Sequence, residues 1–219
     1  MKKYAIIVAG GSGTRFGSTL PKQFVPLGGV PVLMRTIKAF ADYDRDINIV
    51  VALPSEHLTL WGDLCALRNF DVPHKVVEGG ANRFESVRNA LFAVNETECL
   101  VAVHDGARPL VSRQVIAAGF ETAARCGTAI PTVPVTDSIR QLDRNGSHNV
   151  SRESLVAVQT PQTFRVEILK EAYTTAFSPL FTDDASVVEF RGTPVTLYPG
   201  DVNNIKITHP CLLYTSPSP

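Results

Sequence analysis

The sequence predicts an α/β fold, a three-layer α/β/α sandwich built on a mostly parallel sheet, from which a β-hairpin arm protrudes. Three observations lead to this prediction. Short apolar runs alternate with amphipathic segments of helical period, glycine-containing loops follow several of the runs, and one stretch of alternating pattern interrupts the series. At 219 residues, with 44% hydrophobic and 19% charged side chains, the chain can form a proper core and is not of disordered composition.

Charge and cysteine content argue against several classes of partner. Lys plus Arg and Asp plus Glu both number 21, so neither a nucleic acid nor a membrane is an expected partner. The four cysteines are widely spaced and form no CxxC pair, which argues against a zinc knuckle and against a disulfide framework. The sequence has no signal peptide pattern and no apolar run of membrane-spanning length. We therefore expect a cytoplasmic protein.

The first loop is the most informative stretch. An apolar run at residues 4–9 is typical of a buried parallel strand, and it ends in Gly10-Gly11-Ser12-Gly13-Thr14-Arg15-Phe16-Gly17, with Pro21-Lys22-Gln23 close behind. Backbone amides in such a loop favour anions, and Arg15 and Lys22 add positive charge, which predicts a phosphate-binding loop. The loop lacks the Gly-Lys-Ser/Thr of a Walker motif and the third glycine of a dinucleotide fingerprint. An ordinary glycine turn is the alternative.

The next elements establish the alternation. Pro31 and the apolar spacing of residues 32–40 predict an amphipathic helix, and residues 48–53 predict a second strand. A helix over residues 57–67 and a short strand at residues 74–77 follow. Strand and helix in this order indicate βαβ units with a parallel sheet.

A second glycine-containing loop precedes the third helix. Gly79 and Gly80 lead to Asn82, and Glu85 three residues later completes the form of a capping box. Arg83 and Ser86 then lie in the first turns, where they could contact an anion or a base. The alternative is a capped helix with a surface arginine.

A third loop, His104-Asp105-Gly106-Ala107-Arg108-Pro109, follows a buried strand at residues 100–103. Because ligands of parallel α/β sheets bind beyond the carboxyl ends of the strands, this loop and the first two are expected to share one crevice. Asp105 suits a metal ligand or a ribose contact, whereas His104 is expected to be a structural hydrogen bonder.

The protruding arm is predicted for residues 137–158. A helix over residues 112–126 and a strand at 128–135 come first, and the prolines in that strand favour a place at or near the sheet edge. Two alternating stretches then flank an Asn145-Gly146 turn. A two-stranded arm is marginal in water on its own, so we expect it to pack against a second subunit.

The chain then returns to the body. A helix over residues 166–177, a capped helix opening at Thr182-Asp183-Asp184-Ala185-Ser186, and strands at 193–198 and 203–208 are expected. Residues 1–210 are thus predicted to form a single domain. Residues 211–219 have neither helical nor strand periodicity and resemble a translated sequencing adapter, so we interpret them as a non-native tail.

Taken in order, the motifs resemble those of one family. They are the first loop with Pro21-Lys22-Gln23, Gly79-Gly80 with Arg83 and Ser86-Val87, residues 104–109, Thr160-Pro161-Gln162, residues 182–186 and Asn204-Ile205-Lys206. This series resembles the 2-C-methyl-D-erythritol 4-phosphate cytidylyltransferase family from residue 1 to about residue 210. The family continues with an acidic helix where Cys211 stands here.

The resemblance implies a Rossmann-like nucleotidyltransferase fold and a defined reaction. The enzyme would transfer CMP from CTP to 2-C-methyl-D-erythritol 4-phosphate, giving 4-diphosphocytidyl-2-C-methyl-D-erythritol and pyrophosphate in the non-mevalonate route to isoprenoids. Ribitol 5-phosphate, or another sugar phosphate, remains open as the acceptor because related cytidylyltransferases share the pattern. A non-catalytic nucleotide-binding protein and, less favoured, a Rossmann dehydrogenase also remain open.

The resemblance also implies the site residues. Lys22, Lys206 and Arg15 would be catalytic and would neutralise phosphate charge in the transition state. CTP would be bound by Ala9, Gly10, Gly11, Gly13, Gly80, Ser86, Asp105 and Ala107, and the acceptor by Asp105, Arg108, Arg152 and Thr182.

Three further expectations concern the metal, the assembly and the chemistry. Mg²⁺ would be held mainly by CTP phosphates, with Asp105 as a weak protein ligand. A homodimer would form through the arm, and Arg152 would reach the acceptor phosphate across it. No general base is needed, because the acceptor phosphate is already an anion near neutral pH.

Overall fold

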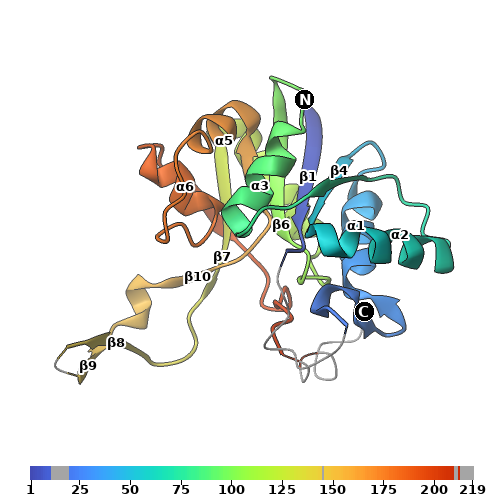
Figure 1. Cartoon of the computed structure of the whole chain (residues 1–219). Coiled ribbons are helices and arrows are strands. Elements are labelled where there is room, and N and C mark those ends of the chain that lie inside the picture. Colours follow the sequence, from blue (N-terminus) through green and yellow to red (C-terminus); the bar gives the residue numbers. More distant parts are fainter. Residues whose placement is uncertain (11–19, 145, 210–211, 213–219) are drawn as a thin grey trace.

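The computed structural model describes residues 1–10, 20–144, 146–209 and 212. Its centre is a sheet in which four parallel strands lie in the order β6, β1, β4, β5 (Figure 1). These strands are β1 (Lys2–Val8), β4 (Asn48–Leu53), β5 (Lys75–Glu78) and β6 (Cys99–Asp105). The predicted parallel core of the sheet is confirmed, and its carboxyl ends lie at the lower end of the body in Figure 1.

Beyond β6 the sheet becomes mixed. The antiparallel strand β11 (Gln162–Arg165) pairs with β6 and with β7 (Thr128–Pro134). The remaining partners of β7 are β10 (Val156–Val158), which is antiparallel, and β12 (Leu197–Pro199), which is parallel. The expectation that the proline-containing strand lies near the edge is confirmed, because beyond β7 the described sheet has only the three-residue strands β10 and β12.

Helices cover both faces of the sheet, which completes the three predicted layers. One face carries α1 (Val32–Tyr43), α2 (Leu58–Leu67) and α4 (Arg113–Cys126); the other carries α3 (Arg83–Phe92), α5 (Val166–Ala172) and α6 (Asp184–Phe190). Neighbouring residues of β1 divide between the two layers, since Ile6 packs against the α3 side and Ile7 against the α1 side, both fully buried. Burial of each such side chain contributes about 1.5–3 kcal/mol.

A short structure after the first loop positions Lys22. Residues Lys22–Phe24 form a 3₁₀ helix, followed by the small hairpin of β2 (Pro26–Leu27) and β3 (Val30–Pro31). Phe24 is buried and stacks on Trp61, with ring centroids 5.9 Å apart. The aromatic contact fixes the 3₁₀ helix against α2, so that Lys22 lies beside the carboxyl end of β1.

The arm is shorter than predicted. It consists of β8 (Ile139–Asp143) paired with β9 (Gly146–Val150) and extends away from the body in Figure 1. The second predicted strand does not continue to residue 158, because residues Arg152–Ser154 form a 3₁₀ turn and β10 then joins the main sheet. Gly146 of the predicted turn has a φ of 129°, and Asn145 lies outside the described residues.

The C-terminal strands are also corrected. The strand expected at residues 193–198 is replaced by a shorter one at Leu197–Pro199, and the strand expected at residues 203–208 is absent. The second segment instead lies against the loop after β6, where the backbone N–H of Ile207 donates to the carbonyl of Ala107 at 2.8 Å. Residues 211–219, apart from Leu212, lie outside the described residues, so their interpretation as a tail stays a prediction.

Two further features concern membranes and thiols. No helix in the described part of the chain combines the length and the apolar character needed to cross a bilayer.

The described cysteines, Cys65, Cys99 and Cys126, are free. Burial raises the pKa of the Cys99 thiol to about 11, so this thiol stays protonated at neutral pH.

Candidate active site

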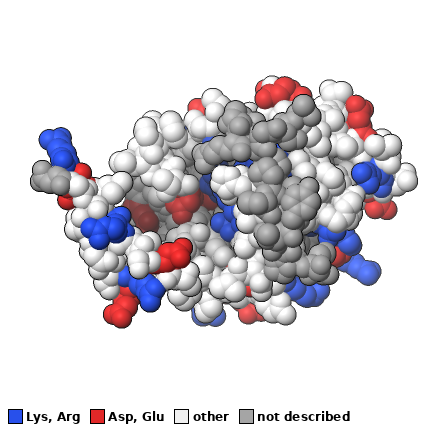
Figure 2. Space-filling model, turned by 90° about the horizontal axis from the view of Figure 1, so that it is seen from below, with Lys and Arg blue, Asp and Glu red and all other residues white. Residues whose placement is uncertain are grey.

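Two adjoining pockets lie at the carboxyl ends of β1 and β6. The first, of about 190 Å³, is lined by Val8, Ala9, Gly10, Lys22, Gln23, Asn82, Arg83, Ser86, Asp105, Ala107 and Lys206. The second, of about 290 Å³, is lined by Arg83, Asp105, Arg108, Val158, Gln159, Thr160, Gln162, Thr182, Asp183 and Lys206. Arg83, Asp105 and Lys206 line both pockets and therefore form their common wall. In Figure 2 basic and acidic atoms meet inside the hollow between the arm and the body.

The first pocket brings together most of the residues predicted to bind a nucleotide. Ala9, Gly10, Lys22, Ser86, Asp105, Ala107 and Lys206 all line it, although they come from five separate parts of the chain. Three other predicted residues, Gly11, Gly13 and Arg15, lie outside the described residues. The prediction that three loops share one crevice agrees with this arrangement.

Gly80 belongs to the same corner through Ser86. Its backbone N–H donates to Ser86 Oγ at 3.0 Å, and the Ser86 hydroxyl donates to the carbonyl of Asn82 at 2.8 Å. A Cβ at position 80 would lie 2.2 Å from Cβ of Glu85, so only glycine fits there without a shift. The predicted cap is present, since Asn82 Oδ1 accepts from the Glu85 N–H at 2.9 Å. The Glu85 carboxylate accepts from the backbone N–H of Ala81 at 2.8 Å, which is one residue before the cap that the capping box predicts as its donor.

Gln23 is a pocket residue that the motifs alone do not single out. The residue is 1% exposed, and its Nε2 donates to the carbonyl of Ala9 at 3.0 Å. This bond ties the 3₁₀ helix carrying Lys22 to the end of β1. The sequence signal is that Gln23 follows Lys22 in the Pro-Lys-Gln motif. The motif does not indicate what the glutamine side chain binds.

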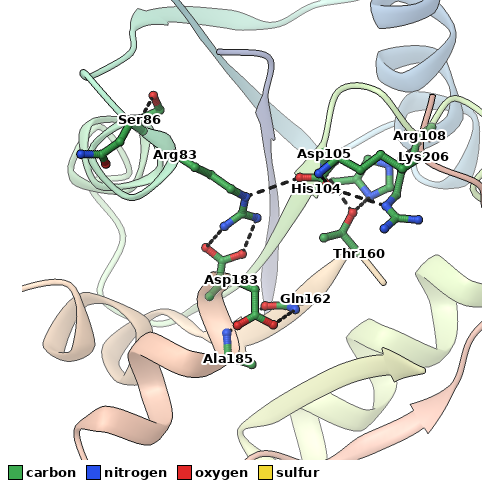
Figure 3. A network of polar contacts seen from close by, with 12 residues as sticks. Arg83, Ser86, His104, Asp105, Arg108, Thr160, Gln162, Asp183, Ala185 and Lys206 are labelled. Atoms are coloured by element: carbon green, nitrogen blue, oxygen red, sulfur yellow. Dashed lines mark hydrogen bonds and ion pairs between the residues drawn. The ribbon is translucent and has the colours of Figure 1, made fainter. Parts of the chain in front are cut away.

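Three cations surround Asp105, namely Arg83 and Lys206 of the common wall and Arg108 of the second pocket (Figure 3). Its Oδ2 lies 2.9 Å from Lys206 Nζ and 3.4 Å from Arg108 Nε, and its Oδ1 lies 3.4 Å from Arg83 Nε. Burial alone would raise the pKa of Asp105, but Arg83, Lys206 and Arg108 hold it below its ordinary value. Asp105 is therefore ionised at neutral pH, and the wall carries more positive than negative charge.

Arg83 is held from its other side by Asp184. The guanidinium makes two bonds to this carboxylate, Nη1 to Oδ1 at 3.1 Å and Nη2 to Oδ2 at 2.7 Å. The sequence allows Arg83 to be either an anion contact or a surface residue. The residue lines both pockets and its guanidinium is held by two carboxylates, so Arg83 is not a free surface arginine. One N–H of each terminal nitrogen remains beyond these bonds, so its role as an anion contact stays a prediction.

His104 has the structural role that was expected. It is fully buried, its Nε2–H donates to the carbonyl of Arg108 at 3.1 Å, and its Nδ1 accepts from the Thr160 hydroxyl at 3.1 Å. Thr160 Oγ1 in turn accepts from the backbone N–H of Asp105 at 3.1 Å. The bonds of the two ring nitrogens identify the Nε2–H tautomer of His104, and they fix the loop that carries Asp105 and Arg108. Burial lowers the pKa of His104 to about 4.

The buried His104 predicts a specific pH dependence of stability. Its folded pKa, about 4, lies below its ordinary value of 6.5, so the unfolded state binds more protons between these pH values. A stabilisation of about 3 kcal/mol is thus complete above pH 6.5 and is lost as the pH falls toward 4. We expect His104→Gln to flatten the free energy of unfolding against pH in this window, measured by urea denaturation. His148→Gln, on the exposed arm, should keep the wild-type slope, and an equal slope in all three proteins would contradict the assignment.

The second pocket contains only part of the predicted acceptor site. Arg108 and Thr182 line it, and Arg108 Nη1 donates to the carbonyl of Asn204 at 2.7 Å. Arg152 does not line it, because it lies on the exposed segment after β9 and donates to the carbonyl of Thr136. A single chain thus brings Arg108, Thr182 and Asp105 together but leaves Arg152 apart.

Comparisons with known proteins identify the family. A family model described as IspD, 2-C-methyl-D-erythritol 4-phosphate cytidylyltransferase, matches residues 4–216. The chain belongs to this family.

Relatives support this membership over nearly the whole chain. The protein of that name from Bacteroides thetaiotaomicron is 51% identical over 210 residues, which cover 96% of this chain and 95% of the relative. The Bacteroides fragilis protein is 49% identical with the same coverage. Among solved structures, that of the Thermus thermophilus protein has a TM-score of 0.78 and 34% identity, covering 99% of this chain and 97% of that one. The chain is therefore a cytidylyltransferase, as the motifs predicted.

The carboxylates of this cytidylyltransferase suit a metal held mostly by a nucleotide. In the part of the chain that the structure describes, no group of three or more His, Cys, Asp and Glu side chains could hold a metal ion. Asp105 is the acidic residue in the wall common to both pockets. Mg²⁺ in phosphate-transfer sites takes one or two carboxylates, with phosphate oxygens and waters as its other ligands. Asp105 fits that donor set as a single weak ligand.

Proposed function

We propose that the chain transfers the cytidylyl group of CTP to 2-C-methyl-D-erythritol 4-phosphate and releases pyrophosphate. The observation that carries this proposal is the pair of pockets with a common wall of Arg83, Asp105 and Lys206. One pocket would take the nucleotide and the other the acceptor. Their shared wall then lies where the two phosphates meet, which is the position that group transfer requires.

The reaction needs charge neutralisation more than proton transfer. A phosphate oxygen of the acceptor attacks the α-phosphorus of CTP, a new P–O bond forms, and the bond to the β-phosphate breaks with pyrophosphate leaving. Both reactants are anions, so they repel one another as they approach. Cations that are already in place at the wall lower this barrier, since they stabilise the charge that builds up in the transition state.

Lys22 and Lys206 are the proposed catalytic cations. Lys22 lies on the 3₁₀ helix that Gln23 ties to β1, so its backbone is fixed on the nucleotide side. Lys206 forms an ion pair with Asp105 and lines both pockets, and its side chain is 40% exposed. Arg15, which lies outside the described residues, is proposed to contact the triphosphate.

The remaining assignments follow the two pockets. Ala9, Gly10, Gly80, Ser86 and Ala107 are proposed to bind the cytidine part of CTP, together with Gly11 and Gly13. Small residues and glycine backbone suit the close approach of a base and a ribose, and Ala9, Ser86 and Ala107 are buried. Arg108 and Thr182 are proposed to hold the acceptor, joined by Arg152 of a second copy in a homodimer, from the segment that follows the arm.

Mg²⁺ is the proposed cofactor, with Asp105 as its protein ligand. The ion would supply positive charge that stabilises the negative charge of the triphosphate. Asp105 lies against three cations, so its negative charge reduces the net positive charge that the ion would meet, and its low pKa keeps the carboxylate ionised at neutral pH. A cytoplasmic location is proposed because the described cysteines are free thiols, the state that a reducing compartment maintains.

Pyrophosphate release tests this function directly. We expect turnover with CTP and 2-C-methyl-D-erythritol 4-phosphate in the presence of Mg²⁺, and loss of turnover when EDTA exceeds the metal. Ribitol 5-phosphate, offered at the same concentration, should give little product. Turnover with ribitol 5-phosphate alone would overturn the acceptor assignment, and unchanged turnover in EDTA would overturn the metal.

A further inference from the structure

We propose that Arg83 and Asp184 form a positioning clamp that holds the common wall of the two pockets in its working geometry. Neither residue is among those proposed above to touch a substrate, and the clamp rests on the proposed transfer reaction. It joins the first turn of α3, on the nucleotide side, to the first turn of α6, on the acceptor side. Figure 3 shows Arg83 reaching from α3 toward Asp105, and Arg83 lines both pockets.

All the nitrogens of the Arg83 guanidinium have a carboxylate partner. Two of them bind Asp184, at 3.1 and 2.7 Å, and Nε faces Asp105 at 3.4 Å. The phenol of Tyr173 donates to Asp184 Oδ1 at 2.6 Å, which holds the carboxylate from behind. The guanidinium is thus fixed in plane, with its Nε directed at the wall.

The burial of the clamp explains its rigidity. The Asp184 side chain is 0% exposed and that of Arg83 is 27% exposed. Burial alone would lower the pKa of Arg83, but the carboxylates of Asp184 and Asp105 raise it above its ordinary value. A bidentate pair in such surroundings has one favoured geometry and is difficult to rearrange.

The geometry of the clamp bears on Asp105 and, through it, on Lys206. With Asp184 in place, Arg83 gives Asp105 a single contact at 3.4 Å, the longest of the distances it makes to the two carboxylates. Without Asp184, the guanidinium would be free to pair with Asp105 through two nitrogens. Such a pair would compete with Lys206, which now holds Asp105 at 2.9 Å.

The nucleotide pocket has contacts of its own that hold α3 in place, so loss of the clamp should affect the two pockets unequally. Asn82 and Ser86 fix the start of α3 through bonds to Glu85 N–H and Gly80 N–H. Phe84 and Val87 pack in the core on the same helix. Asp105 and Lys206, which also face the acceptor, depend on the clamp more directly. We therefore expect acceptor use to suffer more than CTP binding.

Stability alone does not account for the pair. Replacing a buried ion pair by apolar side chains of similar volume is often neutral or stabilising, whereas removing one partner leaves a buried charge unpaired. A variant that loses both charges can therefore be well folded while the wall has lost its support. This separates a positioning role from a merely structural one.

The test compares Arg83→Met/Asp184→Leu with wild type and with a matched control. The control is Lys3→Met/Asp44→Leu, which removes a partly buried ion pair at the opposite end of β1. For the clamp variant we expect a folded protein whose Tm falls by only a few degrees, because the buried Tyr173 hydroxyl loses its acceptor. We also expect a 10- to 100-fold lower kcat/KM for the acceptor, roughly the cost of a misplaced reacting group. KM for CTP should change less than about 3-fold, and the control should keep wild-type kinetics.

Each outcome decides the matter. A folded clamp variant with wild-type acceptor kinetics overturns the proposal, and so does an equal loss for CTP and acceptor. If the double variant does not fold, Asp184→Asn, which keeps the shape of the side chain, should show the same selective loss in kcat/KM, and wild-type values would refute the clamp. If wild type itself releases no pyrophosphate, the proposed function fails, and the clamp falls with it.

Discussion

Lys22→Met is expected to lower kcat by about 10³-fold, equivalent to about 4 kcal/mol of transition-state stabilisation. The reason is the position of Lys22 in the nucleotide pocket, on a 3₁₀ helix held by the bond from Gln23 to Ala9 and by the stacking of Phe24 on Trp61. Methionine keeps the length of the side chain and removes its charge. Single-turnover release of pyrophosphate at saturating CTP measures the chemical step.

Lys38→Met is the matched control for this prediction. Lys38 lies on α1 with a side chain that is 63% exposed, and it pairs with Asp42 outside both pockets. Its replacement should leave kcat within about 2-fold of wild type, as expected for a surface ion pair. If Lys22→Met instead raised KM for CTP with kcat unchanged, Lys22 would contribute to ground-state binding and not to catalysis.

Arg152→Ala is expected to reduce turnover nearly as severely, and mixing experiments should show that it acts across a dimer. Arg152 lies outside both pockets of its own chain, so a direct role requires a second copy. Lys22→Met and Arg152→Ala proteins should each be almost inactive. Unfolded and refolded together, they should regain roughly a quarter of wild-type activity, because half of a random mixture is heterodimer with one intact site.

Two different results would change this assignment. If Arg152 served its own chain, every site in the mixture would carry one defect, and no activity would return. Wild-type activity of Arg152→Ala alone would remove Arg152 from the acceptor site. Arg140→Ala is the control on the arm, because Arg140 bonds to Ser147 within the hairpin. Mixed with Lys22→Met protein, it should show no gain beyond its own activity.

Local patterns in the sequence were sufficient to predict the parallel half of the sheet. The strands at residues 48–53 and 100–103, and the cap at Asn82, are encoded by neighbouring residues, through apolar runs and through side chains that bond within three positions. The three loops shared a predicted crevice for the same reason, since each follows a strand whose direction the alternation fixes. The resemblance then supplied the order of the motifs.

The errors arose where pairing depends on distant parts of the chain. Residues 203–208 have strand-like composition, yet their backbone bonds to the loop after β6 and not to a strand. The clamp joins Arg83 to a residue 101 positions away, a distance that no local pattern spans. Gln23 was passed over because its function is to support Ala9, a contact between a side chain and a backbone that only the fold brings together.

The edges of the main sheet bear on how the protein behaves at high concentration. At one edge lies β5, four residues long with Lys75 and Glu78 at its ends, and at the other lie the three-residue strands β10 and β12, of which β12 ends in Pro199. Short edges with charges or proline offer few free backbone groups in a row, so they are poor templates for strand addition and aggregation. Within the described residues, the two five-residue strands of the arm are longer than either edge. If two chains pair as proposed, we expect the contact to form at the arm and not by strand addition to the main sheet.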